Sequence, residues 1–110
     1  MTDKDILKLV TGFRKGILGR SSPLKKCFMV CSPLVTFMNG CGIECYLTEG
    51  EFALSSFKNN DGIEIGHYWI TLKDGRIIDP TASQFNGMRE EEMPLVYFGD
   101  KPDYYIEYKL

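Results

Sequence analysis

The sequence predicts one α+β domain, with N-terminal helices packed on an antiparallel β-sheet. Helical periodicity and capping signals occur in residues 1–40, whereas β-branched and aromatic runs separated by turn residues occupy 43–108. Helices followed by strands are typical of the α+β class. The chain has 110 residues, near the commonest domain size, and shows no internal repeat or low-complexity tract. We therefore expect a single domain spanning residues 1–110.

The first predicted element is an amphipathic helix that begins after Thr2. Thr2 is suited to the N-cap position, and Asp5 occupies the position that completes a capping box. The breaker-rich stretch 19–23 ends this helix in a loop. The expected buried face consists of apolar residues at helical spacing: Ile6, Val10, Phe13 and Ile17.

A second, mostly apolar helix is expected from Leu24 to Asn39, with Gly40 as its C-cap. Its apolar content indicates burial. Pro33 interrupts the pattern, because a proline inside a helix removes one hydrogen bond and clashes with the preceding turn. The helix therefore either kinks at Pro33 or begins later, with Ser32 as its N-cap.

The rest of the chain reads as short strands and turns. A hairpin is expected to join the strands 66–72 and 77–78 through the turn 73–76. Asp79 directly follows its second strand. The other expected strands are 43–48, 52–54, 95–98 and 104–108. The stretches between them are expected to be a polar loop at 58–62, irregular chain at 80–87, a solvated face at 89–92 and a turn at 99–102.

Charge and hydropathy exclude several classes of partner. The chain has 13 basic and 15 acidic residues, so it carries no electrostatic footprint for nucleic acid or an anionic membrane. No apolar run approaches the roughly 20 residues needed to span a bilayer, and no signal-peptide core follows the charged N-terminus. We expect a cytoplasmic protein. In a reducing compartment its four cysteines would be free thiols, metal ligands or catalytic groups.

Cys27, His67 and Asp79 supply a nucleophile, a base and an orienting carboxylate, and His67 is the only histidine. The predicted hairpin places His67 and Asp79 on neighbouring strands. A thiol is a weak nucleophile at neutral pH unless a base or a positive dipole lowers its pKa. An imidazole that a carboxylate holds in one tautomer is the partner such a thiol needs. These three residues are the predicted catalytic triad.

The same residues resemble a known superfamily. An apolar helix follows Cys27, a Gly-His-Tyr-Trp strand begins at Gly66, and Asp-Gly-Arg-Ile-Ile-Asp-Pro-Thr-Ala-Ser-Gln-Phe ends at Phe85. This pattern resembles the papain-like and transglutaminase-like cysteine enzymes, especially small bacterial and phage members, and is similar to lasso-peptide leader peptidases. The resemblance extends from Cys27 to Phe85 and is most specific from Gly66 onward. It implies a nucleophile at a helix N-terminus and acyl transfer on an amide: peptide hydrolysis, deamidation or transamidation.

Two features depart from that pattern. Cys31 stands where such families tend to have a small hydroxyl residue, which makes it a rival nucleophile. No glutamine precedes Cys27 to complete a papain-type oxyanion hole, so the candidates are Gln84 and backbone N–H groups at the helix start. Tyr68 and Trp69 are candidate pocket residues. The expected substrate is a protein or peptide, with a partner protein as a further source of specificity, and no cofactor or metal is expected.

Two other functions compete with this interpretation. Cys27 and Cys31, followed by Cys41 and Cys45, form a pair of pairs that a four-thiolate zinc site could use, which would make the chain a zinc-stabilised binding module. Against it, the residues between the pairs are apolar and helical in pattern, without the turn formers of a zinc knuckle. The remaining alternative keeps the fold without the chemistry, as an inactive protein-interaction domain.

Overall fold

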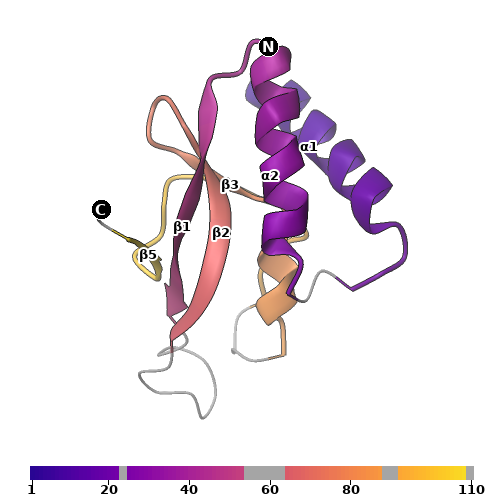
Figure 1. Cartoon of the computed structure of the whole chain (residues 1–110). Coiled ribbons are helices and arrows are strands. Elements are labelled where there is room, and N and C mark those ends of the chain that lie inside the picture. Colours follow the sequence, from indigo (N-terminus) through magenta and orange to yellow (C-terminus); the bar gives the residue numbers. More distant parts are fainter. Residues whose placement is uncertain (23–24, 54–63, 88–91, 109–110) are drawn as a thin grey trace.

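The computed structural model describes residues 1–22, 25–53, 64–87 and 92–108, and it has the expected α+β architecture (Figure 1). Two N-terminal helices pack against a five-stranded antiparallel sheet whose strand order is β4-β3-β2-β1-β5. The elements are α1 (Asp3–Leu18), α2 (Cys27–Gly40), β1 (Cys45–Ala53), β2 (Glu64–Leu72), β3 (Ile77–Asp79), the 3₁₀ helix η1 (Ala82–Phe85), β4 (Tyr97–Gly99) and β5 (Tyr105–Glu107). Within these segments no helix is both long and apolar enough to cross a membrane.

Helix α1 begins at the predicted cap. Thr2 Oγ1 accepts a hydrogen bond from the Asp5 backbone N–H at 3.1 Å, and the Asp5 carboxylate accepts one from the Thr2 N–H at 3.1 Å. This reciprocal pair satisfies two N–H groups that the helix itself cannot. The prediction that Ile17 belongs to the buried face is wrong, because its side chain is 40 % exposed. The neighbouring Leu18 is buried instead.

Helix α2 starts at Cys27, two residues after Lys25, whose positive φ of 60° lies outside the right-handed helical region. The predicted start at Leu24 falls outside the described residues. The helix continues through Pro33, so the alternative start at Ser32 is wrong. Pro33 is exposed. The helix ends at Gly40, and its C-cap is Cys41, one residue later than predicted.

Strands β1 and β2 form the centre of the sheet and pair along nine residues each, from Cys45 opposite Leu72 to Ala53 opposite Glu64. Thus the predicted strands 43–48 and 52–54 are one strand, as far as residue 53. The last two strands are shorter than predicted, and Leu95 is an exposed residue ahead of β4. The predicted loop 58–62 and most of the predicted solvated face, 89–91, lie outside the described residues; Glu92 is exposed as expected.

Consecutive residues of the strands pack into two separate clusters, one on each face of the sheet. The first, which includes Ile70 and Ile78, packs against the helices. Helix α2 lies against β1 and β2, and α1 packs beside α2 (Figure 1). The second cluster is mainly aromatic and contains Trp69, Ile77 and Tyr105. His67 and Asp79 lie two positions from Trp69 and Ile77, so the alternation of a strand places them on this aromatic face.

Candidate active site

The β2–β3 hairpin brings His67 and Asp79 together as the sequence predicts. Its register pairs Ile70 with Ile78, which puts both polar side chains on the same face of neighbouring strands. His67 Nε2 lies 2.7 Å from Asp79 Oδ2, and both side chains are completely shielded from solvent. Because the carboxylate can only accept, the imidazole donates its Nε2–H, which leaves Nδ1 as the nitrogen available to a nucleophile.

Cys27 reaches this pair at a gap in the sheet. Strand β3 ends at Asp79, and continuing its register would place Pro80, which has no N–H, opposite Tyr68. Helix α2 supplies sulfur atoms there instead. The Cys31 thiol donates to the Tyr68 carbonyl at 3.7 Å, and the Tyr68 N–H donates to Cys27. The unpaired backbone groups of Tyr68 on β2 therefore hold the first turns of α2 beside His67.

Asp79 is held by more than the histidine. Its Oδ1 accepts hydrogen bonds from the Thr81 backbone N–H at 3.0 Å and from the Thr81 hydroxyl at 3.3 Å. Its Oδ2 accepts the Tyr105 hydroxyl at 2.6 Å. The following carbonyl, that of Pro80, accepts the Arg14 Nε–H of α1 at 2.7 Å. Sequence reasoning missed Tyr105 and Arg14, because 26 and 66 residues separate them from their partners and no local pattern connects them.

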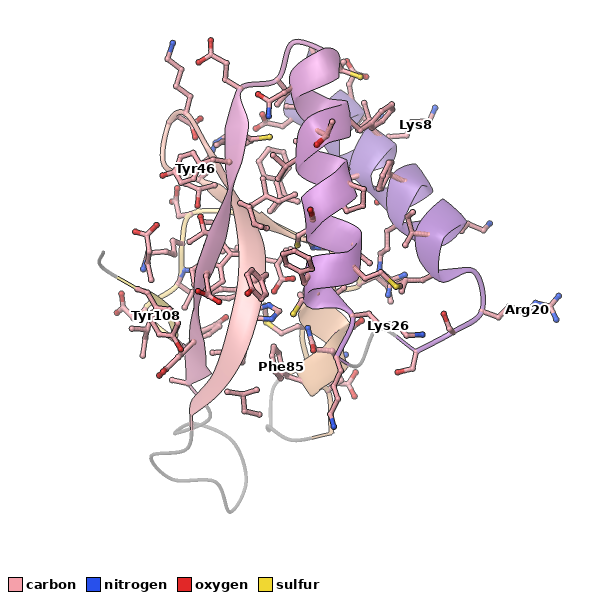
Figure 2. The ribbon with its side chains drawn as sticks, viewed as in Figure 1. Lys8, Arg20, Lys26, Tyr46, Phe85 and Tyr108 are labelled. Atoms are coloured by element: carbon pink, nitrogen blue, oxygen red, sulfur yellow. The ribbon has the colours of Figure 1, made fainter. Side chains whose placement is uncertain are left out.

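Aromatic rings enclose the imidazole. The Phe85 and Phe52 rings meet it edge-on, with centroids 5.0 Å and 5.9 Å from its own, and Trp69 lies 6.0 Å away. Phe85 comes from η1 and Phe52 from β1. In Figure 2, Phe85 lies near the end of α2 at which Lys26 precedes the helix. This enclosure removes water from the His67–Asp79 pair, which strengthens their attraction.

The electrostatics favour an activated thiol at Cys27. Burial by itself lowers the pKa of His67, but the charge and hydrogen bond of Asp79, with a further contribution from Cys27, raise that pKa from 6.5 to about 9. Burial raises the pKa of Cys27. The hydrogen bond and positive charge of His67, with the N–H groups of Tyr68 and Phe28, outweigh burial, so the pKa of Cys27 falls below its ordinary 9.0.

Cys31, the rival nucleophile, has the opposite environment. Its side chain is fully buried, and burial together with the negative charges of Asp79 and Cys27 raises its pKa well above 9.0. Cys27 is half-buried. Of the two thiols, Cys27 is therefore the one that combines access to solvent with a lowered pKa.

The four cysteines do not come together. Cys41 follows the last residue of α2, and ten residues of helical rise, about 15 Å, separate Cys31 from Cys41 along the helix axis. Cys45 instead contacts Asn39 and the Val35 carbonyl. The described residues contain no group of three His, Cys, Asp or Glu side chains that could hold a metal ion.

Of the predicted oxyanion and pocket residues, two lie at the surface of the site. Gln84 Nε2 is 3.3 Å from His67 Nδ1 and donates to Thr81 Oγ1 at 3.0 Å, and Gln84 Oε1 accepts the Lys25 N–H at 3.3 Å. The Tyr68 ring packs edge-on against the Phe28 ring, with centroids 5.0 Å apart. Trp69 is wholly buried in the aromatic cluster, so it has no exposed surface that a substrate could contact.

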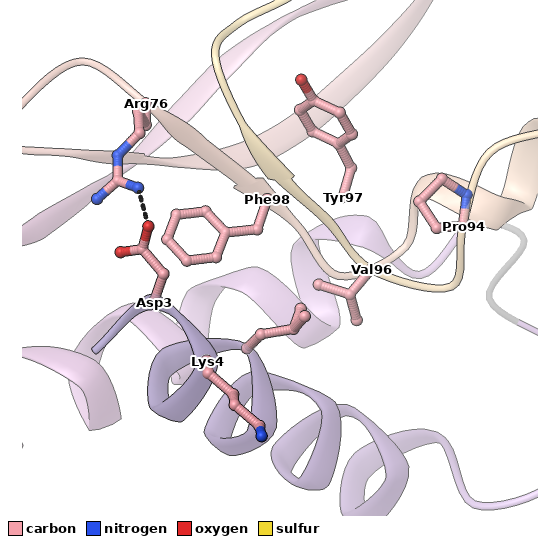
Figure 3. Close-up of a pocket in the computed structure, with 8 residues that line it drawn as sticks. Asp3, Lys4, Arg76, Pro94, Val96, Tyr97 and Phe98 are labelled. Atoms are coloured by element: carbon pink, nitrogen blue, oxygen red, sulfur yellow. Dashed lines mark hydrogen bonds and ion pairs between the residues drawn. The ribbon is translucent and has the colours of Figure 1, made fainter. Parts of the chain in front are cut away.

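A separate hollow of about 390 Å³ lies between the start of α1 and β4 (Figure 3). At its edge Arg76 forms an ion pair with Asp3 at 2.8 Å, and its guanidinium lies 4.8 Å from the centre of the Phe98 ring. The described residues that line it include none of Cys27, His67 and Asp79. This hollow is therefore distinct from the triad.

Comparison of the chain with protein-family models, with curated proteins and with solved structures finds no match.

Proposed function

We propose that this protein is a cysteine enzyme that transfers the acyl group of an amide or peptide bond through Cys27, His67 and Asp79. The observation that carries the proposal is the chain of contacts from the Cys27 thiol through His67 to Asp79, whose last link is 2.7 Å long and fully buried. Groups with perturbed pKa values cluster at functional sites, and this buried network ends at a half-buried thiol.

The proposed mechanism starts from a Cys27 thiolate and a protonated His67. The thiolate attacks the amide carbonyl carbon and forms a C–S bond, and the imidazolium then gives its Nδ1 proton to the departing nitrogen as the C–N bond breaks. A water molecule or an amine then attacks the carbonyl carbon of this thioester and loses its proton to the neutral His67. The C–S bond breaks, and Cys27 is released as the thiolate. Water completes a protease or deamidase reaction, and an amine completes a transglutaminase-type reaction.

Two groups could stabilise the oxyanion. Cys27 is the first residue of α2, and the N–H groups of a first helical turn have no acceptor within the helix. The Gln84 amide lies at His67 Nδ1. Once His67 is protonated, Nδ1 no longer accepts a hydrogen bond, which frees this amide N–H to donate to the oxyanion.

The arrangement of elements supports the resemblance to papain-like and transglutaminase-like enzymes. In this proposal α2 is their core helix, with the nucleophile at its first residue, and β2 and β3 are the strands that carry the histidine and the acid. Phe28 is 52 % exposed beside Tyr68, and this aromatic pair is a candidate contact for a substrate side chain. The expected substrate is a protein or peptide.

The test is alkylation of the native protein by iodoacetamide from pH 5 to 9, with mass-spectrometric mapping of each cysteine. Cys27 should react selectively below pH 7, because its thiolate is stabilised by His67. His67→Gln should abolish this acid-pH reaction. Cys41 is the internal reference, because it is exposed and lies at the other end of α2.

Three results would contradict the proposal. Labelling of Cys27 only near the free-thiol pKa of about 8.5 favours the inactive interaction domain. Labelling of Cys31 in place of Cys27 would assign the nucleophile to Cys31. Protection of all four cysteines from labelling until a chelator is added favours the zinc-stabilised binding module. With acid-pH labelling established, a peptide-amide library assayed with Cys27→Ala as the blank would identify the substrate.

A further inference from the structure

Tyr105 shares the oxygen through which Asp79 holds the histidine. The Tyr105 hydroxyl lies 2.6 Å from Asp79 Oδ2, and His67 Nε2 lies 2.7 Å from the same atom. All three side chains have at most 1 % of their surface exposed. One carboxylate oxygen thus accepts one proton donor from β2 and another from β5, the strand on the opposite side of β1 from β2.

The position of Tyr105 is set by the sheet and by its aromatic neighbours. It pairs with Phe52 of β1, and its ring meets the Phe52 and Trp69 rings edge-on, with centroids 5.0 Å and 5.3 Å away. A phenylalanine would make these contacts equally well. Packing therefore does not explain the hydroxyl, because a buried hydroxyl is costly unless it finds an acceptor.

We infer that Tyr105 is a positioning residue of the proposed triad: its hydroxyl orients Asp79 and takes up part of the carboxylate charge, which limits how tightly His67 holds its proton. The inference rests on the proposed function for its role in the reaction. An imidazolium that holds its proton too tightly transfers it poorly to the departing nitrogen. Sharing of Oδ2 therefore favours this proton transfer, which accompanies the breaking of the C–N bond.

The hydroxyl is a dependable donor. Burial, followed by the negative charge of Asp79, raises the pKa of Tyr105 far above its ordinary value of 10.0, so the phenol stays neutral across the working pH range. Among the residues that the structure describes, the titratable groups that face His67 come from three elements: Cys27 from α2, Asp79 from β3 and Tyr105 from β5. Cys31 lies one helical turn beyond Cys27 and stays protonated.

The test is an NMR titration of the imidazole, which is direct because His67 is the only histidine. Tyr105→Phe should raise the pKa of His67 by roughly half a unit to one unit, because Asp79 then directs its full charge at the imidazolium. Tyr97→Phe is the matched control. It removes a hydroxyl from the same aromatic cluster that donates to the Asp100 carbonyl instead of Asp79. Its His67 pKa should stay within about 0.2 units of the parent value.

A second variant tests the same hydrogen bond without removing it. Site-specific replacement of Tyr105 by 3-fluorotyrosine makes the phenol a stronger donor, so the pKa of His67 should fall. A residue that only packs would give no shift in either variant, and that result, or shifts in the reverse directions, overturns the inference. The fluorinated protein also keeps the test valid where Tyr105→Phe fails to fold.

Iodoacetamide labelling of Cys27 in the same samples separates the two proposals. Acid-pH labelling of the parent protein with no shift of the His67 pKa in Tyr105→Phe overturns the role of Tyr105 alone. The expected shifts without any acid-pH labelling overturn the proposed enzyme and leave the link between Tyr105 and His67 in place.

Discussion

At the scale of single residues, Asp79 organises the site because four hydrogen bonds converge on its two oxygens. Donors from three directions leave the carboxylate one orientation. That orientation directs Nδ1 of His67 away from β3, toward the thiol of α2. A buried charge needs such partners, because its desolvation otherwise costs several kcal/mol.

The raised pKa of His67 predicts a pH dependence of stability, which is simplest to measure in Cys27→Ala, where the neighbouring thiol no longer titrates. The folded state holds the imidazole proton more tightly than the unfolded chain, with a pKa of about 9 against 6.5 in the parent protein. This stabilisation is complete below pH 6.5 and is lost as the pH rises toward 9. The free energy of unfolding, measured with urea at pH 6, 7.5 and 9, should therefore fall.

The control for this prediction is the double variant Cys27→Ala/His67→Gln. It keeps every other titrating group, so the fall attributable to His67 should disappear from its pH profile. An identical fall in both proteins would show that His67 is not the group responsible.

At the scale of elements, Gly50 allows β1, β2 and β5 to approach each other beside the site. It pairs with His67 on β2 and with Glu107 on β5. A Cβ at this position would lie 2.2 Å from the Ile106 carbonyl oxygen and 2.4 Å from the Trp69 ring. Neither neighbour is the free end of a flexible side chain, so the strands would have to separate.

We predict that Gly50→Ala lowers the free energy of unfolding by about 3 kcal/mol, the upper part of the range for overpacked cores. Gly66→Ala is the matched control, because Gly66 lies on the adjacent strand and its Cβ would meet no atom of the described residues within 4 Å. That variant should change stability by less than about 1 kcal/mol. Equal losses in the two variants, measured by urea unfolding, would contradict the close approach at Gly50.

Helix α2 illustrates how an element can tolerate a residue that local rules disfavour. Pro33 removes one backbone hydrogen bond, yet the helix starts at Cys27 and runs through it. Leu34 and Met38 are wholly buried in the cluster that contains Ile70 of the sheet, and this burial outweighs the loss. The consequence for the site is that Cys27, and not a residue after Pro33, begins the helix.

At the scale of the whole molecule, the core consists of two apolar clusters, one on each face of the sheet. About 15 Å of helix separates Cys31 from Cys41, and Cys45 contacts Asn39, so the four thiols do not converge on one point. We therefore predict that millimolar EDTA leaves the melting temperature unchanged to within about 1 °C, and that added Zn²⁺ does not raise it. A drop on chelation that zinc reverses would restore the zinc-stabilised binding module as the better interpretation.

The sequence by itself determined the α+β class, the first helix and its cap, and the hairpin that joins His67 to Asp79. Each depends on signals within about 15 residues: capping geometry, periodicity and turn chemistry. Short edge strands were placed less well, because pairing sets their ends.

The tertiary structure alone decided what surrounds the triad. Tyr105 reaches Asp79 from another strand, and Cys27 reaches His67 because Pro80 leaves the edge of β2 open to α2. It also distinguished the two helix cysteines, since burial and charge act oppositely on Cys27 and Cys31. Such differences depend on distances between segments remote in sequence, and desolvation and Coulomb energies follow those distances and not the order of residues.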